Sequence, residues 1–245
     1  MTRGSANHLV DGTNSHATSR KPRPDPVKST TRQAIHLKMM LQSRIRQITQ
    51  TLLALSCALQ AATSAADFSR VVIDAGHGGH DRGAGFSHTY EKHLALDVAR
   101  RLDLYLRSQG INTTLTRDRD KFVSLSQRVA ISHAAGDAIF ISIHFNYARR
   151  RSALGIETFY NARNANSRRL AQMVQSAALY KTRSRNRGVK HARFHVLSQN
   201  RQPAILFECA FLTNSSDRRR ALDPLYRQRI AEALAMAVIK FRASG

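Results

Sequence analysis

The 245-residue sequence has only two cysteines and no long apolar run. Cys57 lies in a segment that we expect to be removed on export, so Cys209 alone remains and no internal disulfide can form. The apolar stretch between Gln50 and Gln60 is well short of the roughly 20 residues needed to span a bilayer. The sequence therefore predicts neither a disulfide-stabilised fold nor a stable membrane span after that removal.

Acidic residues are also scarce, since 16 Asp and Glu stand against 39 Lys and Arg. Nine of the basic and two of the acidic residues lie in residues 1–66, so residues 67–245 keep a formal charge of +16. Such a charge favours a polyanionic partner. No recognisable DNA-binding helix accompanies it, so we expect no nucleic acid. For an exported protein, anionic polymers of the cell envelope are one interpretation and a solubilising surface charge is the other.

Residues 1–38 are polar and contain three prolines, and they show neither strand alternation nor a helical stripe. This composition predicts a disordered or an untranslated extension. A targeting segment follows it, although such a segment normally stands at the very N-terminus. We therefore expect translation to begin at Met39 or Met40.

Residues 39–66 have the three parts of a secretory signal peptide. Two arginines precede a short apolar core at 52–59, and small residues fill 61–66. We expect cleavage near Ala66 and an exported protein, either periplasmic or secreted.

Residues 67–245 alternate strand-like runs with helical patterns and contain no internal repeat. This order predicts a single α/β domain with a largely parallel twisted sheet flanked by helices. The predicted strands are 71–75, 111–116, 139–144, 155–160, 195–197 and 203–208, and the predicted helices are 89–108, 124–136, 167–180 and 224–241.

Three of the predicted strands end close to polar residues that bind metals or transfer protons. His77 follows the first run, His144 ends the most apolar run, and Glu208 ends the last. The carboxyl ends of parallel strands meet at one edge of a sheet, where open α/β folds place their sites. Any one of these residues alone has a simple structural explanation, but their coincidence at one edge favours a metal site.

Glu91 lies in the first turn of the helix that follows the glycine-rich loop after His77. A carboxylate at a helix N-terminus has a structural explanation, since the helix dipole favours it there. Together with His77 and His144, however, it makes a set of two imidazoles and one carboxylate that leaves a fourth position open, as in catalytic zinc sites. Mg²⁺ and Ca²⁺ favour more oxygen ligands. Glu208 ends so apolar a strand that we expect it to act as an acid/base.

The same residues carry a family resemblance. The chain resembles the zinc-dependent N-acetylmuramoyl-L-alanine amidases of the Amidase_3 type in an ordered series of motifs: Gly76-His77-Gly78-Gly79, Glu91-Lys92, Thr116-Arg117-Asp118, Ser142-Ile143-His144-Phe145-Asn146, Asn186-Arg187-Gly188-Val189-Lys190 and Glu208-x-x-Phe211-Leu212-Thr213-Asn214. The agreement runs from about Val71 to Phe241. Arg82 and Ala210 depart from residues common in the family, and neither is a predicted ligand.

The resemblance implies that residues 67–245 form a zinc amidase catalytic domain that acts on peptidoglycan. It implies one zinc per chain on His77, Glu91 and His144, with Glu208 as the catalytic acid/base. The bond cleaved would be the amide between N-acetylmuramic acid and L-alanine.

Three more residues are candidates for binding substrate, namely Asn146, Arg187 and Lys190. The two basic ones could contact a carboxylate of the stem peptide, or could be surface charges near a turn at Gly188. The segment from Tyr160 to Asn186 is long enough for one helix only and not for the long inhibitory segment of some family members, so we expect a constitutively open enzyme. We also expect a monomer. The same metal site could serve a zinc peptidase or a deacetylase acting on wall material, and a non-catalytic basic envelope-binding protein is a third hypothesis.

Overall fold

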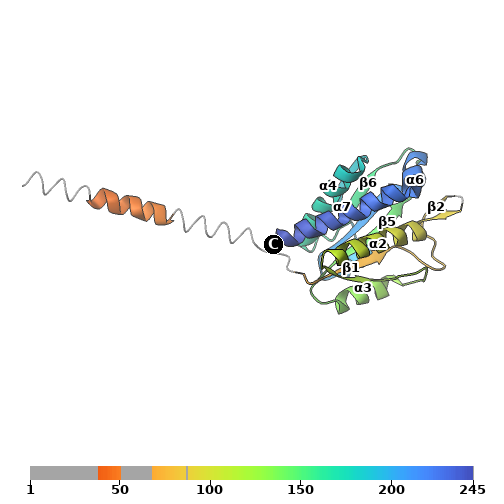
Figure 1. Ribbon diagram of the computed structural model, residues 1–245, viewed down its shortest axis with the longest axis horizontal. Helices are drawn as coiled ribbons and strands as arrows, with labels where there is room; N and C mark the ends of the chain where they lie inside the picture. The colour runs from red at the N-terminus through yellow and green to blue at the C-terminus, as the bar shows by residue number, and fades with distance from the viewer. Residues whose placement is uncertain (1–37, 51–67, 87, 245) are drawn as a thin grey trace, which may run out of the picture. The chain divides into compact units, whose positions relative to one another are not determined.

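The computed structural model describes residues 38–50, 68–86 and 88–244 (Figure 1). The chain divides into two compact units, residues 1–59 and 60–245. The described part of the first unit, residues 38–50, is helical and exposed. Most of the predicted signal peptide, residues 51–66, and the extension up to residue 37 lie outside the described residues, so both stay predictions. No helix within the described ranges combines the length and apolarity that a membrane crossing requires.

A six-stranded sheet forms the centre of the second unit. Its spatial order is β4 (Asn112–Leu115), β1 (Arg70–Ala75), β5 (Ala138–Asn146), β8 (Ala204–Phe211), β6 (Ile156–Tyr160) and β7 (Asn186–His191). The first four strands are parallel to one another, and β6 pairs with β8 antiparallel. The last strand, β7, runs parallel to β6. The prediction of a largely parallel sheet is confirmed, with two reversed strands at one side.

Helices cover both faces of this sheet. One face carries α2 (Glu91–Ser108), α4 (Ala165–Thr182) and α7 (Pro224–Ala243), which pack against one another in Figure 1. The other face carries α3 (Leu125–Ala134) and the single turn α5 (His195–Ser198). The larger hydrophobic cluster lies under the first set and the smaller one under α3 and α5. The second layer is therefore thin, and it leaves room for a cavity beside the sheet.

Local sequence signals place the starts of two helices, α3 and α7, as predicted. Ser124 and Gln127 form a capping box at the start of α3, with Ser124 Oγ accepting from the Gln127 N–H at 3.2 Å. Asp223 caps α7, and Pro224 occupies its first turn. The first helix, α2, begins at Glu91 rather than near Thr89, because residues 89–90 form strand β3, which pairs with β2 (Gly85–Phe86).

Besides β2 and β3, three further elements differ from the sequence prediction. Residues 195–197 form a helical turn, not a strand, and the prediction was wrong because one turn buries Val196 and Leu197 against the sheet as well as a strand would. The strand β7 was not predicted, since its sequence is polar and does not alternate. The helix α6 (Ser215–Leu222) was also missed, although Asn214 caps it with two hydrogen bonds.

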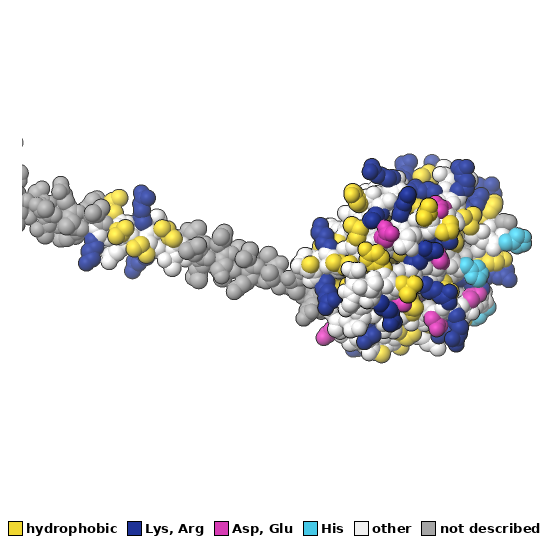
Figure 2. All heavy atoms as spheres, in the orientation of Figure 1, with side chains coloured by type: hydrophobic (Ala, Val, Ile, Leu, Met, Phe, Trp, Pro, Cys, Tyr) yellow, Lys and Arg dark blue, Asp and Glu magenta, His cyan; other side chains and the backbone are white. Residues whose placement is uncertain are grey.

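Basic side chains are dispersed over the second unit. Figure 2 shows Lys and Arg across the visible face of this unit, with acidic groups between them and no single dominant patch. On this face the basic side chains are therefore spread out and not gathered into one patch.

A buried ion pair between Asp74 and Arg128 joins α3 to β1. Asp74 is 1% exposed, and its Oδ1 accepts from Arg128 Nη1 at 2.5 Å and from Thr116 Oγ1 at 2.7 Å. Ser142 Oγ donates to Oδ2 at 2.7 Å. Arg128 Nη2 also donates to the carbonyl of His77 at 2.7 Å, so the pair supports the loop that carries this histidine. Burial alone would raise the pKa of Asp74, but the charge of Arg128 and these hydrogen bonds outweigh it and lower the pKa.

We expect Asp74→Ala to destabilise the protein by about 3–5 kcal/mol at pH 7, because Arg128 is left buried without its partner. The pKa of Asp74 is lower in the folded than in the unfolded protein. The ionised carboxylate therefore contributes its full stabilisation above about pH 4, the pKa of an unfolded Asp. This stabilisation is lost as the pH falls through the pKa of Asp74 in the folded protein. Urea denaturation at pH 7 and pH 3 should show the difference between wild type and variant shrinking at the lower pH. Asp118→Ala, at an exposed carboxylate, is the matched control. A difference that does not change with pH would contradict this assignment.

Candidate active site and metal centre

Three side chains from separate elements converge at the C-terminal edge of the sheet. His77 lies in the loop after β1, Glu91 is the first residue of α2, and His144 lies near the end of β5. One donor atom from each lies within 4.8 Å of the other two. His144 Nδ1 is 2.7 Å from Glu91 Oε1, and His77 Nε2 is 3.1 Å from Glu91 Oε2. The structure thus brings together the three residues that the sequence analysis selected as metal ligands.

Glycines make this close approach possible. A Cβ on Gly76 would lie 2.4 Å from Cε1 of His144, and a Cβ on Gly83 would lie 2.5 Å from Cδ2 of His77. His77 itself has a positive φ of 60°, which few residues other than glycine adopt. The glycine-rich loop therefore shapes the site by letting the backbone pass directly beside both imidazoles.

The contacts of Glu91 decide between its two interpretations. Its carboxylate is 3% exposed and accepts N–H groups from Ala84 at 2.8 Å and from Phe145 at 2.9 Å, in addition to the two imidazoles. Neither backbone group belongs to the first turn of α2, so the carboxylate faces the histidines rather than capping its own helix. The helix N-terminus places Glu91, and the loop and β5 orient it.

The electrostatics of the three residues suit a cation. Burial would raise the pKa of Glu91, but hydrogen bonds and positive charge from His144 and His77 outweigh it and hold the pKa well below its ordinary value. Burial would lower the pKa of His77, but Glu91 and Asp81 raise it. Asp81 Oδ2 is 2.8 Å from His77 Nδ1, which leaves Nε2 directed toward Glu91. A carboxylate behind a histidine in this way is typical of metal sites, so the donor set fits a zinc ion.

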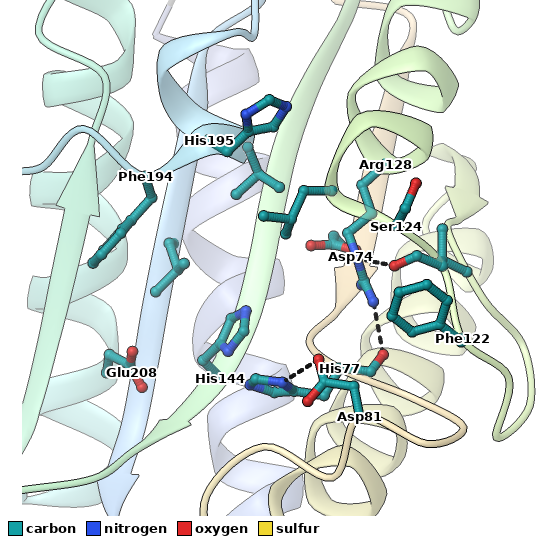
Figure 3. A pocket seen from close by; sticks show the side chains of 14 residues that line it. Asp74, His77, Asp81, Phe122, Ser124, Arg128, His144, Phe194, His195 and Glu208 are labelled. Atoms are coloured by element: carbon teal, nitrogen blue, oxygen red, sulfur yellow. Dashed lines mark hydrogen bonds and ion pairs between the residues drawn. The ribbon is translucent and has the colours of Figure 1, made fainter.

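Glu208 lies on the strand next to His144. The two residues are Cα partners in the parallel pairing of β5 and β8, and Figure 3 shows Glu208 and His144 on neighbouring strands. The strand continues three residues past Glu208 to Phe211, so the prediction that it ends there was wrong. Glu208 Oε2 is buried and has no hydrogen-bond partner among the described residues. Burial, followed by the charges of Glu91 and Glu157, raises the pKa of Glu208 well above its ordinary value.

The three candidate substrate-binding residues meet at a residue that the sequence analysis missed. Glu157, on β6, accepts from Asn146 Nδ2 at 2.8 Å, from Arg187 Nε at 3.0 Å and from Lys190 Nζ at 2.5 Å. It is also the Cα partner of Glu208 across β6 and β8. A charged residue within a mostly apolar strand was the signal that could have identified it.

A cavity of about 360 Å³ opens beside the sheet between α3 and α5. His77, His144 and Glu208 line one part of it (Figure 3). Phe122 and Phe194, each more than two-fifths exposed, line the part formed by α3 and α5. Two of the three predicted ligands, His77 and His144, therefore share one accessible space with Glu208.

Comparisons with known proteins identify a family for most of residues 67–245. The Amidase_3 family, described as N-acetylmuramoyl-L-alanine amidase, matches residues 71–240. N-acetylmuramoyl-L-alanine amidase LytC of Bacillus subtilis (strain 168) is 36% identical over 173 residues, which cover 70% of this chain and 35% of LytC. Probable cell wall amidase LytH of Staphylococcus epidermidis (strain ATCC 12228 / FDA PCI 1200) is 34% identical over 177 residues, 71% of this chain and 58% of LytH. The chain thus spans about a third of the length of one relative and more than half of the other.

Solved structures share the fold. The crystal structure of an N-acetylmuramoyl-L-alanine amidase from Clostridium difficile 630 superposes with a TM-score of 0.69 at 34% identity, covering 71% of this chain and 96% of that one. The catalytic domain of the amidase CwlV from Bacillus (Paenibacillus) polymyxa var. colistinus gives 0.69 at 30% identity, covering 73% of this chain and all of that one. Both matches cover nearly the whole of the solved chain, so the likeness extends over a complete domain.

We expect Gly76→Ala to weaken zinc binding without preventing folding. Gly76 has no positive φ, so the added methyl acts only through its contact with His144, whose ring must move away from Glu91. The affinity for zinc should fall about 10- to 100-fold, as when other groups that support metal ligands are changed. Competition with a chromophoric chelator measures it.

Gly136→Ala is the control for this experiment. A Cβ there meets nothing within 4 Å, while a φ of 69° gives backbone strain of about 1–2 kcal/mol. This variant should lose stability and keep its zinc affinity. Equal zinc affinities in wild type and Gly76→Ala would show that His144 does not depend on the glycine.

Proposed function

This chain belongs to the Amidase_3 family of N-acetylmuramoyl-L-alanine amidases, and we propose that it hydrolyses the amide between N-acetylmuramic acid and L-alanine in peptidoglycan. The observation that carries this proposal is the convergence of His77, Glu91 and His144 beside the buried Glu208. The arrangement combines three possible metal ligands with a carboxylate whose buried Oε2 accepts no hydrogen bond from any described residue. Both parts are needed for metal-assisted hydrolysis of an amide.

Zinc would be held by His77, Glu91 and His144, one ion per chain. Two imidazoles and one carboxylate are typical of catalytic zinc, which keeps a further position for water or substrate. When bound, the ion supplies Lewis acidity toward water and the amide carbonyl. Asp81 would fix the orientation of the His77 ring, and the backbone N–H groups of Ala84 and Phe145 would fix the Glu91 carboxylate.

Glu208 would act as the general acid/base. As a base it takes a proton from the attacking water, and as an acid it delivers that proton to the nitrogen of the departing L-alanine. Its buried position and raised pKa support both steps, because a carboxyl group with an ordinary pKa would release the proton to solvent too readily. The cavity next to it gives substrate access to this carboxylate.

Asn146, Arg187 and Lys190 would contact the substrate. The side chains of Arg187 and Lys190 are 32% and 42% exposed, so both cations can reach a ligand while they remain bound to Glu157. One carboxylate and two cations leave one net positive charge on this cluster. A free carboxylate of the stem peptide is the substrate group that this charge would attract.

Export is part of the proposal. Peptidoglycan lies outside the cytoplasm, and the pattern of residues 39–66 supports delivery by a signal peptide to the periplasm or the exterior. The dispersed positive charge of residues 67–245 would then hold a monomeric enzyme on anionic polymers of the envelope.

Product analysis tests the reaction. Digestion of purified sacculi with residues 67–245 should release stem peptides with a free L-alanine amino group and leave the glycan strands intact, as measured by mass spectrometry. Removal of zinc with a chelator should abolish the release, and added zinc should restore it. Acetate or peptides cut between amino acids would instead favour a deacetylase or a zinc peptidase. Bound zinc without any hydrolysis would favour a non-catalytic envelope-binding protein.

We expect Glu208→Gln to keep its zinc and to lose turnover. The amide cannot exchange protons, so kcat should fall about 10²- to 10⁴-fold, the usual contribution of a general acid/base. Zinc content by atomic emission and kcat on the same preparation separate the two roles. Substantial activity in this variant would overturn the assignment of Glu208.

A further inference from the structure

Glu157 is a buried carboxylate that the proposed reaction does not use. Its side chain is 5% exposed, and both of its oxygens are occupied. One oxygen accepts from Asn146, and the other accepts from both Arg187 and Lys190. One cation would be enough to neutralise the charge of this carboxylate, but Glu157 binds two.

A bulge in the edge strand brings both cations to the same side. Ile156 pairs with Asn186 and Thr158 pairs with Val189, so the single residue Glu157 lies opposite two residues of β7. Side chains alternate along a regular strand, and positions 187 and 190 would then face opposite sides of the sheet. The bulge adds one residue to β7, and we assign it to Gly188, which has a φ of 86°. This residue shifts by one position the side of the sheet that the following side chains face, so Arg187 and Lys190 both lie on the side of Glu157.

The same side of the sheet carries Glu208. Glu157 and Glu208 are directly opposite each other in the antiparallel pairing of β6 and β8. Opposite residues in such a pair have Cβ atoms about 4.5–5.5 Å apart. Long basic side chains that reach Glu157 can therefore also reach Glu208, which has an unpartnered buried oxygen.

An ion pair between Glu208 and either cation would disable the proposed acid/base. The cation would occupy the oxygen that has to accept the proton of the attacking water. We infer that Glu157 is a positioning residue of the active site: it binds Arg187 and Lys190 and so keeps both cations away from the Glu208 carboxylate. This inference rests on the proposed function, in which Glu208 transfers the proton. It differs from substrate binding, because Glu157 acts on Glu208 through the two cations.

Rescue by charge removal tests the inference. Glu157→Gln should keep its zinc and lose about 10- to 100-fold in kcat, part of what a general acid/base contributes, because the released cations pair with Glu208. Adding Arg187→Gln and Lys190→Gln to this variant removes those cations, so the triple variant should recover most of the lost kcat. The triple variant should still have a higher KM than wild type for muropeptides with a free peptide carboxylate, because it lacks the two cations proposed to bind that group. Glu232→Gln, at the ion pair with Lys181 between α4 and α7, is the matched control and should behave as wild type.

Measurements of kcat, KM, zinc content and thermal unfolding on all four proteins distinguish the outcomes. A triple variant no faster than Glu157→Gln, or a Glu157→Gln protein with wild-type kcat, would overturn the inference. So would a loss of zinc or of folding in Glu157→Gln, which would make Glu157 a structural residue. If the zinc-loaded wild type released no stem peptides, the proposed function would fail instead.

Discussion

Charge buried at one edge of the sheet is the constraint on which this site depends. An ionised carboxylate loses several kcal/mol of favourable hydration on burial unless cations or N–H and O–H donors replace the water. The chain buries Asp74, Glu91, Glu157 and Glu208 there. The first three are satisfied by partners from other elements, so the same contacts join the elements of the site. Asp74 joins α3 to β1 through Arg128, Glu91 joins α2 to β5, and Glu157 joins β6 to β5 and β7.

Glu208 differs from the other three because, within residues 68–86 and 88–244, no donor satisfies its buried Oε2. Its burial raises the cost of ionisation, and the neighbouring charges of Glu91 and Glu157 raise it further. Folded proteins keep a destabilising buried carboxylate mainly at functional sites, where the free energy of the surrounding contacts offsets the cost of burying it. The contrast within one set of carboxylates is therefore a stronger argument for the role of Glu208 than its burial alone. The paired members hold the site together, and the remaining one is the carboxylate that we propose as the acid/base.

The sequence was sufficient to predict the parts of the fold that depend on local chemistry. The capping box at Ser124 and the proline after Asp223 predicted helix starts, and apolar runs predicted β1, β5 and β8. It also predicted that His77 and His144 meet, since parallel strands end at a common edge. It failed where tertiary contacts decide, as in the polar edge strand β7 and the single turn α5, whose two buried apolar residues suit a strand equally well. Glu157 was missed because its significance lies in residues far away in the chain.

The reversed strands explain that last failure. Catalytic residues of parallel α/β sheets are sought where strands end, but an antiparallel neighbour begins at the same edge. The strands β6 and β7 both run opposite to β8, so both begin at the edge of the sheet toward which β5 and β8 run. Glu157 is the second residue of β6 and Arg187 the second of β7, and the bulge at Gly188 adds Lys190 to the same side. In a mixed sheet of this kind, polar residues at the beginnings of the reversed strands belong to the site as much as those at the ends of the parallel ones.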